Sequence, residues 1–392
     1  MGNGNSTQVA YQDNMHVVIV GGGQSGCYLA VQLLKSNFCK VTLIDPRDAM
    51  YHNHGAMRAA VNEEFINYMF LPFADMLGSS FQRGTVVAMD SNNKTLTLKS
   101  GYQVRYTHLV IATGEDMPFP FKLGGENAEL SAAKAADLLN QYRLELSDCN
   151  RIALIGGGYN SVEMAGEIKT AFPEKEVIII TDEDHLVTKR AKPALQANLL
   201  NILQQKGIAV IHNDSVYNLE SVITNTRADG QVLKTKNGKV LVTDFLINTE
   251  GTRINNGFYE KDLAESISPN GTLDVDDYLR VKGHDNIYAV GDVTSVEEEK
   301  TPCTPNEHAK VVKANLIAEC NNATLTAYKA VMEVVLVSVG SEAGVSQICG
   351  MQFGNFPTKM AKGKDRNSSS TWTDLGLQLP AITPEVCQGS KV

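Results

Sequence analysis

The stretch His16-Val17-Val18-Ile19-Val20-Gly21-Gly22-Gly23-Gln24-Ser25-Gly26 decides the fold of this chain. Its apolar half predicts a buried strand, a G-x-G-x-x-G turn follows, and a helix-like stretch begins at Cys27. This order places backbone N–H groups and a helix N-terminus where a pyrophosphate can bind. The next apolar strand, at 41–44, ends before Asp45, an acid suited to an adenosine ribose. The stretch therefore predicts a dinucleotide site whose contacts are Gly21, Gly22, Gly23, Gln24, Ser25, Gly26 and Asp45.

A second copy of the pattern stands at 152–161, IALIGGGYNS, again between a strand and a helix. A single glycine turn is weak support, because such turns also join strands and helices in folds that bind nothing, but two copies in the right setting are specific. Ser161 stands where the third glycine belongs, so helix and strand must accommodate a small hydroxyl there. Gly156, Gly158 and Asn160 are the expected contacts of this second turn. Two dinucleotides in one chain predict electron transfer between them.

Composition limits the class of protein. At 392 residues the chain is long enough for two or three domains, and 43% hydrophobic with 20% charged residues is typical of a soluble globular protein. The net charge of −9 argues against a nucleic-acid partner. We expect no transmembrane span, because the densest apolar run, 331–339, is short and contains Glu333, and no signal peptide, because the N-terminus is polar.

The seven cysteines are scattered and form no C-x-x-C pair, which fits a reducing compartment. Disulfide reductases with two dinucleotides need redox-active cysteines beside the flavin, but the corresponding region, 51–55, reads YHNHG. We therefore expect electrons to leave directly from the flavin, and we expect no metal site.

The fold class predicted is α/β, with two Rossmann-like domains of the FAD/NAD(P)-linked reductase type and a small α+β C-terminal domain. A strand at 108–111 ends near Thr113 and Gly114, where the backbone can approach a dinucleotide, and the second unit ends at Gly251. The strand of 286–292 then returns to the first domain and ends at Asp292, which either holds ribityl hydroxyls of a flavin or is simply an acid in a turn. The predicted boundaries are 1–13 (flexible arm), 14–131 with 252–324 (FAD domain), 132–251 (NAD(P)H domain), 325–377 (C-terminal domain) and 378–392 (disordered tail).

Three further features complete the outline. The segment Thr304-Pro305-Asn306-Glu307 has the form of a capping box and predicts a helix to about Cys320, whose positive end either faces the flavin or is merely well capped. Strands are expected at 331–339 and 345–353. The locally basic stretch 359–366 is either a solvated surface or part of the site.

With these motifs located, the chain resembles the ferroptosis-suppressor branch of the apoptosis-inducing-factor flavoproteins, relatives of type II NADH:quinone oxidoreductases. The resemblance covers nearly all of 14–375. Its most specific segments are HVVIVGGGQSG (16–26), HNHGAMRAAV (52–61), LVIATG (109–114), GGGYNSVEMAGEIKTAFPEKEV (156–177), VKGHDNIYAVGD (281–292) and STW (370–372).

This resemblance implies bound FAD, unmodified or in a 6-hydroxy form, and NADH or NADPH as reductant. It implies reduction of lipid quinones such as ubiquinone at a membrane surface, which gives radical-trapping quinol that suppresses lipid peroxidation and ferroptosis. Carried over by position, it places FAD contacts at Gly21 to Ser25, Arg58, Val86 and Asp292. It also places Glu163 near the nicotinamide, where the alternative is an acid that complements a helix dipole, and it places Lys122 and Lys362 near flavin and quinone. The chain departs from the family at Ser161 and at Glu250, where a smaller residue is usual.

The sequence leaves alternatives open for reductant and function. Acids within 181–184 favour an unmodified ribose and thus NADH, whereas Lys189 and Arg190 can accept a 2′-phosphate. The rival to a quinone reductase is a redox-signalling flavoprotein of the apoptosis-inducing-factor type that acts through partner association. A reductase for a small iron–sulfur protein is a third possibility.

The N-terminus predicts membrane attachment. Residues 1–6, MGNGNS, fit the N-myristoylation pattern with Gly2 as acceptor. One acyl chain binds only marginally, so a second element is needed, and we expect it from Lys359, Lys362, Lys364 and Arg366. The expected location is cytoplasmic and peripheral, on the plasma membrane, a lipid droplet or the outer mitochondrial surface, with an oligomer allowed.

Overall fold

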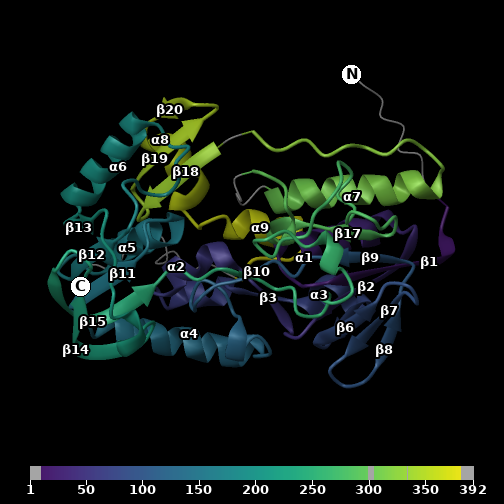
Figure 1. Ribbon diagram of the computed structural model, residues 1–392, viewed down its shortest axis with the longest axis horizontal. Helices are drawn as coiled ribbons and strands as arrows, with labels where there is room; N and C mark the ends of the chain where they lie inside the picture. Colours follow the sequence, from purple (N-terminus) through teal and green to yellow (C-terminus); the bar gives the residue numbers. More distant parts are fainter. Residues whose placement is uncertain (1–9, 299–303, 333, 381–392) are drawn as a thin grey trace.

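The computed structural model describes residues 10–298, 304–332 and 334–380, in two lobes with a C-terminal module on one of them (Figure 1). Predictions for Gly2 and for the tail beyond 380 lie outside the described residues. None of the helices in the described ranges is both long and apolar enough to cross a membrane.

The first lobe is built on a parallel five-stranded sheet in the order β17-β9-β1-β2-β5. Its strands and main helices are β1 (Gln12–Val20), β2 (Cys39–Asp45), β5 (Phe81–Arg83), β9 (His108–Ile111), β17 (Ile287–Ala289), α1 (Gln24–Ser36) and α7 (Thr304–Cys320). The pairing of β17 with β9 confirms that the chain returns to this lobe. The predicted arm is too long, because Gln12 already pairs with Cys39 in the sheet.

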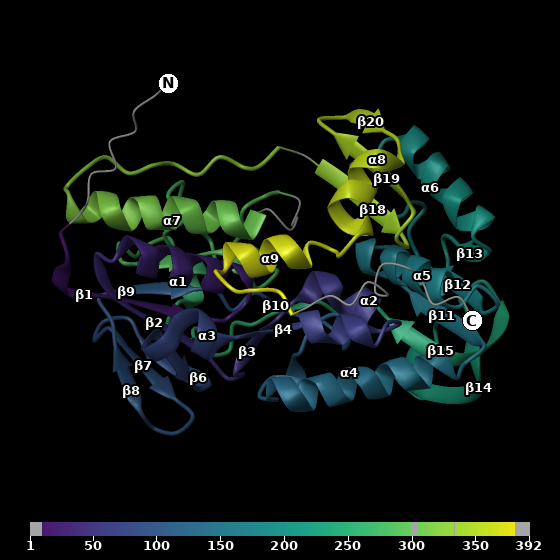
Figure 2. The same cartoon turned by 180° about the vertical axis from the view of Figure 1, so that it is seen from behind.

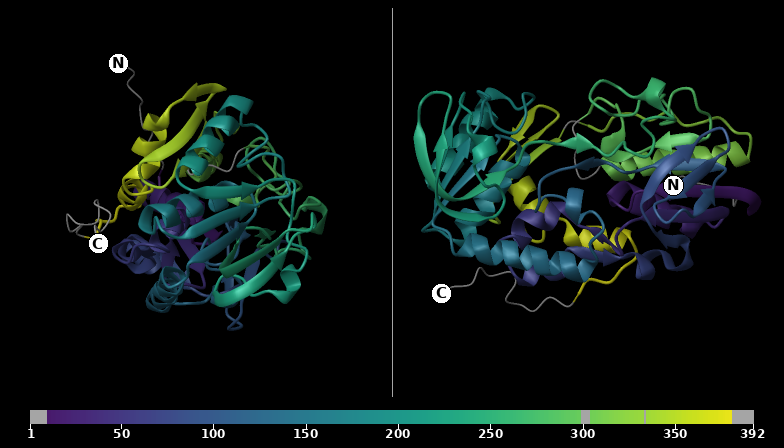
Figure 3. Two further views of the ribbon diagram at one scale, coloured as in Figure 1. Left: turned by 90° about the vertical axis from the view of Figure 1, so that its left-hand side faces the viewer. Right: turned by 60° about the horizontal axis from the view of Figure 1, so that its bottom comes forward.

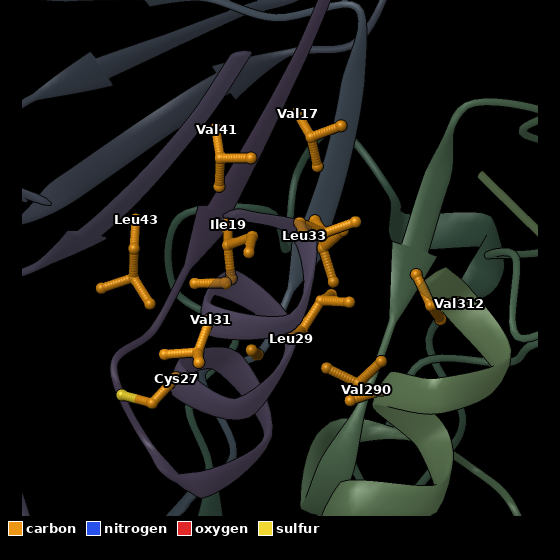
Figure 4. Close-up of a cluster of buried hydrophobic side chains, with 14 of the residues drawn as sticks. Val17, Ile19, Cys27, Leu29, Val31, Leu33, Val41, Leu43, Val290 and Val312 are labelled. Atoms are coloured by element: carbon orange, nitrogen blue, oxygen red, sulfur yellow. The ribbon is translucent and has the colours of Figure 1, made fainter. Parts of the chain in front are cut away.

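The core of this lobe lies under α1 and α7, which share one face of the sheet (Figure 4). Val17 and Ile19 of β1 pack with Leu29 and Leu33 of α1, and Val312 of α7 completes the cluster; all five are fully buried. The four-residue spacing on α1 puts both leucines on one face. This packing fixes the start of α1 directly beyond β1, so the first glycine turn is held between two rigid elements.

The second lobe has the order β13-β12-β11-β15-β14, parallel except for the edge strand β14. Its elements are α4 (Ala132–Ser147), β11 (Arg151–Ile155), α5 (Tyr159–Ala171), β12 (Glu176–Ile180), α6 (Pro193–Gln205), β13 (Ile208–Ile211), β14 (Arg227–Lys234) and β15 (Val240–Asn248). The two segments that connect the lobes pair as β10 (Glu115–Asp116) and β16 (Arg253–Ile254), as the right view of Figure 3 allows the reader to follow.

The C-terminal module is an antiparallel sheet of β18 (Val334–Val339), β19 (Ala343–Ile348) and β20 (Met351–Phe353) with short helices. The predicted single strand at 345–353 is wrong, because Cys349 and Gly350 adopt positive φ and turn the chain. The helical segments are α8 (Asn355–Thr358), a π-helix at Lys359–Gly363 and α9 (Ser368–Asp374). The module packs on α5 and α6 of the second lobe, while α9 lies toward the first lobe (Figure 2).

Smaller elements complete the first lobe. The expected hairpin region is a three-stranded sheet, β6 (Val86–Asp90), β7 (Thr95–Leu98) and β8 (Gln103–Arg105). The others are β3 (Ala49–Tyr51), β4 (Phe70–Pro72), α2 (Ala56–Ala59) and α3 (Phe73–Leu77), with 3₁₀ turns at Asn53–Gly55, Glu64–Tyr68, Gly78–Ser80, Gly125–Asn127, Ala264–Ser266 and Gly291–Val293. A further 3₁₀ turn, Leu219–Ser221, belongs to the second lobe.

Gly166 of α5 sets how closely the C-terminal module approaches the second lobe. A Cβ at this position would lie 2.5 Å from the backbone N of Gly340 and 2.6 Å from Cα of Val339. Backbone atoms cannot yield as a flexible side chain can, so only glycine permits this contact.

We expect Gly166→Ala to lower the free energy of unfolding by about 1–3 kcal/mol, because the added methyl group must push β18 away from α5. Urea unfolding of purified protein measures the change. Gly257→Ala is the control, since a Cβ at Gly257 meets no atom within 4 Å. Equal stability of the two variants would contradict the tight contact.

Candidate active site: one cavity shared by two glycine turns

A cavity of about 1250 Å³ lies between the two lobes and the C-terminal module. This exceeds the roughly 300–1,000 Å³ typical of small-molecule pockets. Its wall includes the first glycine turn, the start of α5 after the second turn, Asp292, and apolar residues of the C-terminal module. Both predicted dinucleotide sites therefore open into one space.

The first glycine turn is held by backbone contacts that tolerate no side chain. A Cβ on Gly21 would lie 2.4 Å from the carbonyl oxygen of Ala112, and one on Gly26 only 2.0 Å from that of Gly21. A Cβ on Gly23 meets nothing within 4 Å, and Gly23 caps α1 without a side-chain hydrogen bond. The start of α1 thus lies beside open space at the cavity wall, which suits a phosphate group.

Asp45 holds this turn in place. Its Oδ2 accepts hydrogen bonds from Gly22 N at 2.6 Å and from Nη2 of Arg47 at 2.9 Å, and its Oδ1 accepts from N and Nε of Arg47. These four bonds use the acceptor positions of the carboxylate. Contact with a ribose, as predicted, therefore requires Arg47 to give up one of them.

Asp292 lines the cavity close to the first glycine turn, in an ion-pair chain with Lys122. The Lys122 ammonium donates to Asp292 Oδ2 at 3.1 Å and to Glu115 Oε1 at 3.2 Å. The turn that carries Asp292 is fixed from behind by buried His308, whose Nδ1 accepts from Gly291 N at 3.1 Å. The other ring nitrogen, Nε2, lies 2.8 Å from Oε1 of Glu298.

His308 was not predicted as a site residue, because its partners Gly291 and Glu298 are distant along the chain. The capping box predicted the helix that carries His308 but gave no indication of the histidine itself. His54 was quoted only as part of a motif, and it lines the cavity. Its neighbour His52 is buried, and burial lowers the pKa of His52 to about 4.

Glu163 and Lys362, predicted near nicotinamide and quinone, form a buried pair on the cavity wall. Glu163 Oε1 accepts from Lys362 Nζ at 2.7 Å and from Ser338 N at 3.1 Å, while Oε2 accepts from Arg366. Burial alone would raise the pKa of Glu163, but the charges of Lys362 and Arg366 outweigh it and lower the pKa to about 2. Glu163 is therefore an anion at neutral pH, held by cations from the C-terminal module.

Arg58 belongs to the same charge cluster rather than to the cavity wall. Its guanidinium donates to both carboxylate oxygens of Glu167, at 2.9 and 3.1 Å, and to the carbonyls of Gly363 and Lys364. Arg366, 2% exposed, also pairs with Glu167. The guanidinium of Arg58 thus joins α2 to the C-terminal module, and its predicted flavin contact stays a prediction.

The basic stretch 359–366 needs a correction. Lys362 and Arg366 are buried in ion pairs with Glu163, so neither is a surface cation for a membrane. Lys359 is exposed but pairs with Glu342, and Lys364 is exposed. The sequence shows that this stretch is basic, but it does not show that Lys362 and Arg366 face a buried acid, Glu163.

The second glycine turn is less open than the first. Gly158 and Asn160 line the cavity, and Asn160 Nδ2 contacts Met117 Sδ at 3.4 Å. Ser161 stands where the pattern has its third glycine, and its hydroxyl is buried without a hydrogen-bond partner. Burying an unpaired hydroxyl costs free energy, so the serine destabilises this turn relative to glycine.

The structure brings most predicted site residues together. Those that line the cavity are Gly21, Gly22, Gly23, Gln24, Ser25, Asp45, Val86, Thr113, Gly114, Lys122, Gly158, Asn160, Glu163, Asp292 and Lys362. Those outside its wall are Gly26, Arg58, Gly156 and Gly251. Gly26 and Gly156 shape their turns instead, because close contacts surround both.

Comparisons with known proteins agree with this architecture. Residues 15–327 match the family model described as pyridine nucleotide-disulphide oxidoreductase. The chain is 32% identical to the ferroptosis suppressor protein 1 of Taeniopygia guttata over 96% of its own length and 100% of that protein. It is 28% identical to apoptosis-inducing factor homolog A of Dictyostelium discoideum, over 90% of each chain.

Among solved structures, the sulfide:quinone oxidoreductase of Aquifex aeolicus superimposes with a TM-score of 0.71. It shares 18% identity, and the match covers 96% of each chain. At that identity the likeness concerns the fold.

We expect Glu163→Gln to lower the free energy of unfolding by about 3–5 kcal/mol, because it leaves Lys362 and Arg366 buried beside a neutral partner. Glu342→Gln, which removes the exposed partner of Lys359, is the matched control and should cost about 0–1 kcal/mol. Urea unfolding of the two variants compares them directly. A similar small loss for both would show that the buried cluster contributes no more than a surface pair.

Proposed function

The chain belongs to the pyridine nucleotide-disulphide oxidoreductase family and is an oxidoreductase, and on this premise we propose that it is an FAD-dependent NAD(P)H:quinone oxidoreductase acting on lipid quinones such as ubiquinone. One observation carries the proposal: both glycine turns open into one cavity whose far wall is apolar. The sequence has no C-x-x-C pair, which favours direct transfer from flavin to acceptor over transfer through a disulfide.

The residues around the first turn fit FAD. Gly21 to Ser25 leave a cradle for its pyrophosphate at the start of α1, Thr113 and Gly114 form the adjacent wall, and Asp292 offers carboxylate oxygens to ribityl hydroxyls. When bound, FAD supplies two-electron transfer between a nicotinamide and a quinone. The fit does not distinguish FAD from its 6-hydroxy form.

Two lysines supply positive charge at the wall of this space. Lys122 is fixed by Glu115 and Asp292. Lys362 is fixed by Glu163 and by the carbonyl of Leu336, and its Nζ lies 5.8 Å from the centre of the Tyr159 ring. Preorganised cations of this kind stabilise negative charge that develops on a ring acceptor during reduction. We assign Lys362 to the electron-accepting step and Glu163 to holding Lys362 in position beside the nicotinamide site.

The wall beside Lys362 suits a quinone with an apolar tail. Its side chains are Val331, Met332, Val334, Leu336 and Ala361. Close to Ala361 along the chain, Phe356 and Met360 are 75% and 72% exposed. Exposed apolar side chains that gather in one patch can mark a membrane or protein contact. We propose that this surface, with the exposed Lys364 and a myristoylated Gly2, rests on a lipid leaflet and lets the quinone enter.

For the reductant we propose NADH in preference to NADPH. The loop after β12 carries Asp182 and Glu183, which disfavour a 2′-phosphate, and Lys189 lies 3.6 Å from Glu183 rather than unpaired. The product, a quinol, traps lipid radicals, so we propose suppression of lipid peroxidation and ferroptosis as the role of the protein. This agrees with the name of its relatives.

The second candidate is a redox-signalling flavoprotein that acts through partner association. It is favoured by the likeness to an apoptosis-inducing factor homolog. The two candidates differ in turnover, since signalling needs none.

We expect the purified protein to be yellow and to oxidise NADH with a short-chain ubiquinone analogue well above the rate with oxygen alone. Asp292→Ala should weaken flavin retention by about 1.5–3 kcal/mol, because a charge-assisted contact to the ribityl chain is lost. Absorbance of the bound flavin and NADH oxidation measure the two effects.

Asp285→Ala, an exposed acid in the same lobe, is the control and should keep flavin and turnover. Full flavin occupancy in Asp292→Ala at micromolar protein would remove Asp292 from the flavin site. Turnover no faster than the oxygen background would favour the signalling candidate.

We expect the double variant Phe356→Ser with Met360→Ser to reduce co-sedimentation of myristoylated protein with liposomes, because about 2 kcal/mol of transfer free energy is lost for each buried apolar side chain. Gly2→Ala should release the protein more fully. Val240→Ser, which removes an exposed apolar side chain from the second lobe, is the control. Unchanged binding by the double variant would place the membrane contact elsewhere.

A further inference from the structure

The two glycine turns differ in the atoms that lie closest to their first glycine, Gly21 in the first turn and Gly156 in the second. At the first turn, the atoms closest to a Cβ on Gly21 belong to the backbone of Ala112 and Thr113. At the second turn, a Cβ on Gly156 would lie 2.7 Å from the hydroxyl oxygen of Thr249, and next 3.0 Å from Cγ and 3.2 Å from Oε1 of Glu250. The second turn thus has a carboxylate side chain directly against it.

The pairing of the strands identifies which residues of the two lobes occupy equivalent positions. Val20 pairs with Ile111 in the first lobe, and Ile155 pairs with Asn248 in the second. Counting two residues on from each partner, Thr113 and Glu250 occupy equivalent positions, and each is followed by a glycine with positive φ, Gly114 and Gly251. A neutral residue therefore stands at the first turn where an acid stands at the second.

The acid that follows the second strand also stands at a different position in the two lobes. Val20 also pairs with Ile44, and Ile155 with Ile180, so Thr181 is the counterpart of Asp45. Whereas Asp45 is neutralised by Arg47, the acid after Thr181 is Asp182, whose charge acts on Glu250. The helix that begins across the turn presents the uncharged Tyr159 and Asn160. The ammonium of Lys362 lies 5.8 Å from the Tyr159 ring, but it is paired with Glu163.

We propose that Glu250 is a specificity-determining residue of the second site: as a carboxylate against the turn, it disfavours the pyrophosphate of a nicotinamide nucleotide, and it does so less when protonated. This rests on the proposed function, which assigns the second turn to that nucleotide. Like charges at contact distance repel strongly where solvent is partly excluded.

The pH dependence has a definite sign. Partial burial, and next the charge of Asp182, raise the pKa of Glu250 above its usual 4.5. The fraction of Glu250 that carries a charge grows as pH rises through this pKa. Nucleotide affinity is therefore expected to fall with rising pH across that range, and a variant that cannot ionise should lack this dependence.

The experiment is calorimetric titration of the purified holoprotein with ADP-ribose, which carries the pyrophosphate, and with adenosine, which carries no phosphate. The variants are Glu250→Gln and Glu250→Thr, the latter giving the second turn the residue of the first. Glu220→Gln is the matched control, because Glu220 is an exposed acid of the same lobe, as Glu250 is, but is not among the residues nearest Gly156. Titrations between about pH 4 and pH 8 run from below the usual pKa of a glutamate to well above it.

Both Glu250 variants should bind ADP-ribose about fivefold more tightly than the native protein at the upper pH, with a smaller gain at the lower pH. Adenosine binding, and ADP-ribose binding by the Glu220 variant, should stay unchanged. Weaker or unaltered ADP-ribose binding in the Glu250 variants overturns the proposal, since the carboxylate would then support the nucleotide or be irrelevant to it. That result would leave quinone turnover untouched, whereas loss of the proposed function shows as absent turnover in native protein.

Discussion

The charge cluster around Glu163 is the interaction on which the arrangement of this molecule depends. One carboxylate on α5 accepts bonds from Lys362, Arg366 and the backbone of Ser338, and Glu167 one turn later binds Arg58 and Arg366. Buried charges need partners, because desolvation of each ion costs several kcal/mol that only close pairing offsets. The second lobe, α2 and the C-terminal module are therefore held in one relative position, with Lys362 facing the cavity.

The same constraint links architecture to chemistry. In the proposed function, an ammonium group that is fixed before the reaction stabilises developing charge without the energy cost of reorganisation. Glu163 fixes Lys362, while Glu115 and Asp292 fix Lys122. The buried bond from Gly291 to His308 holds the turn of Asp292 in the same manner. The site is thus preorganised by groups that themselves lie behind its wall.

The two lobes repeat one supersecondary unit but are not equivalent in charge. The first turn pairs its acid, Asp45, with Arg47, and it faces neutral Thr113. The second turn has Thr181 at the place of that acid and faces Glu250. A shared backbone therefore presents two different electrostatic environments, consistent with one dinucleotide that stays bound and one that exchanges.

Both glycine turns, the strands beside them, the helix at 304–320 and the return of the chain to the first sheet could be predicted from the sequence. These depend on local patterns: apolar runs, glycine spacing and a capping box act over a few residues, so they can be recognised without the fold. The split of the predicted strand at Cys349 was missed, because positive φ at a cysteine has no sequence pattern.

Which charged side chains pair with one another depends on how the elements pack. Arg58, Lys362 and Arg366 lie far from Glu163 and Glu167 along the chain, and a basic residue has the same appearance in the sequence whether it is solvated or buried in a pair. The same holds for Glu250, whose place against Gly156 follows from the register of β15 beside β11. Burial and pairing are properties of long-range contacts, which depend on how the lobes and the C-terminal module pack.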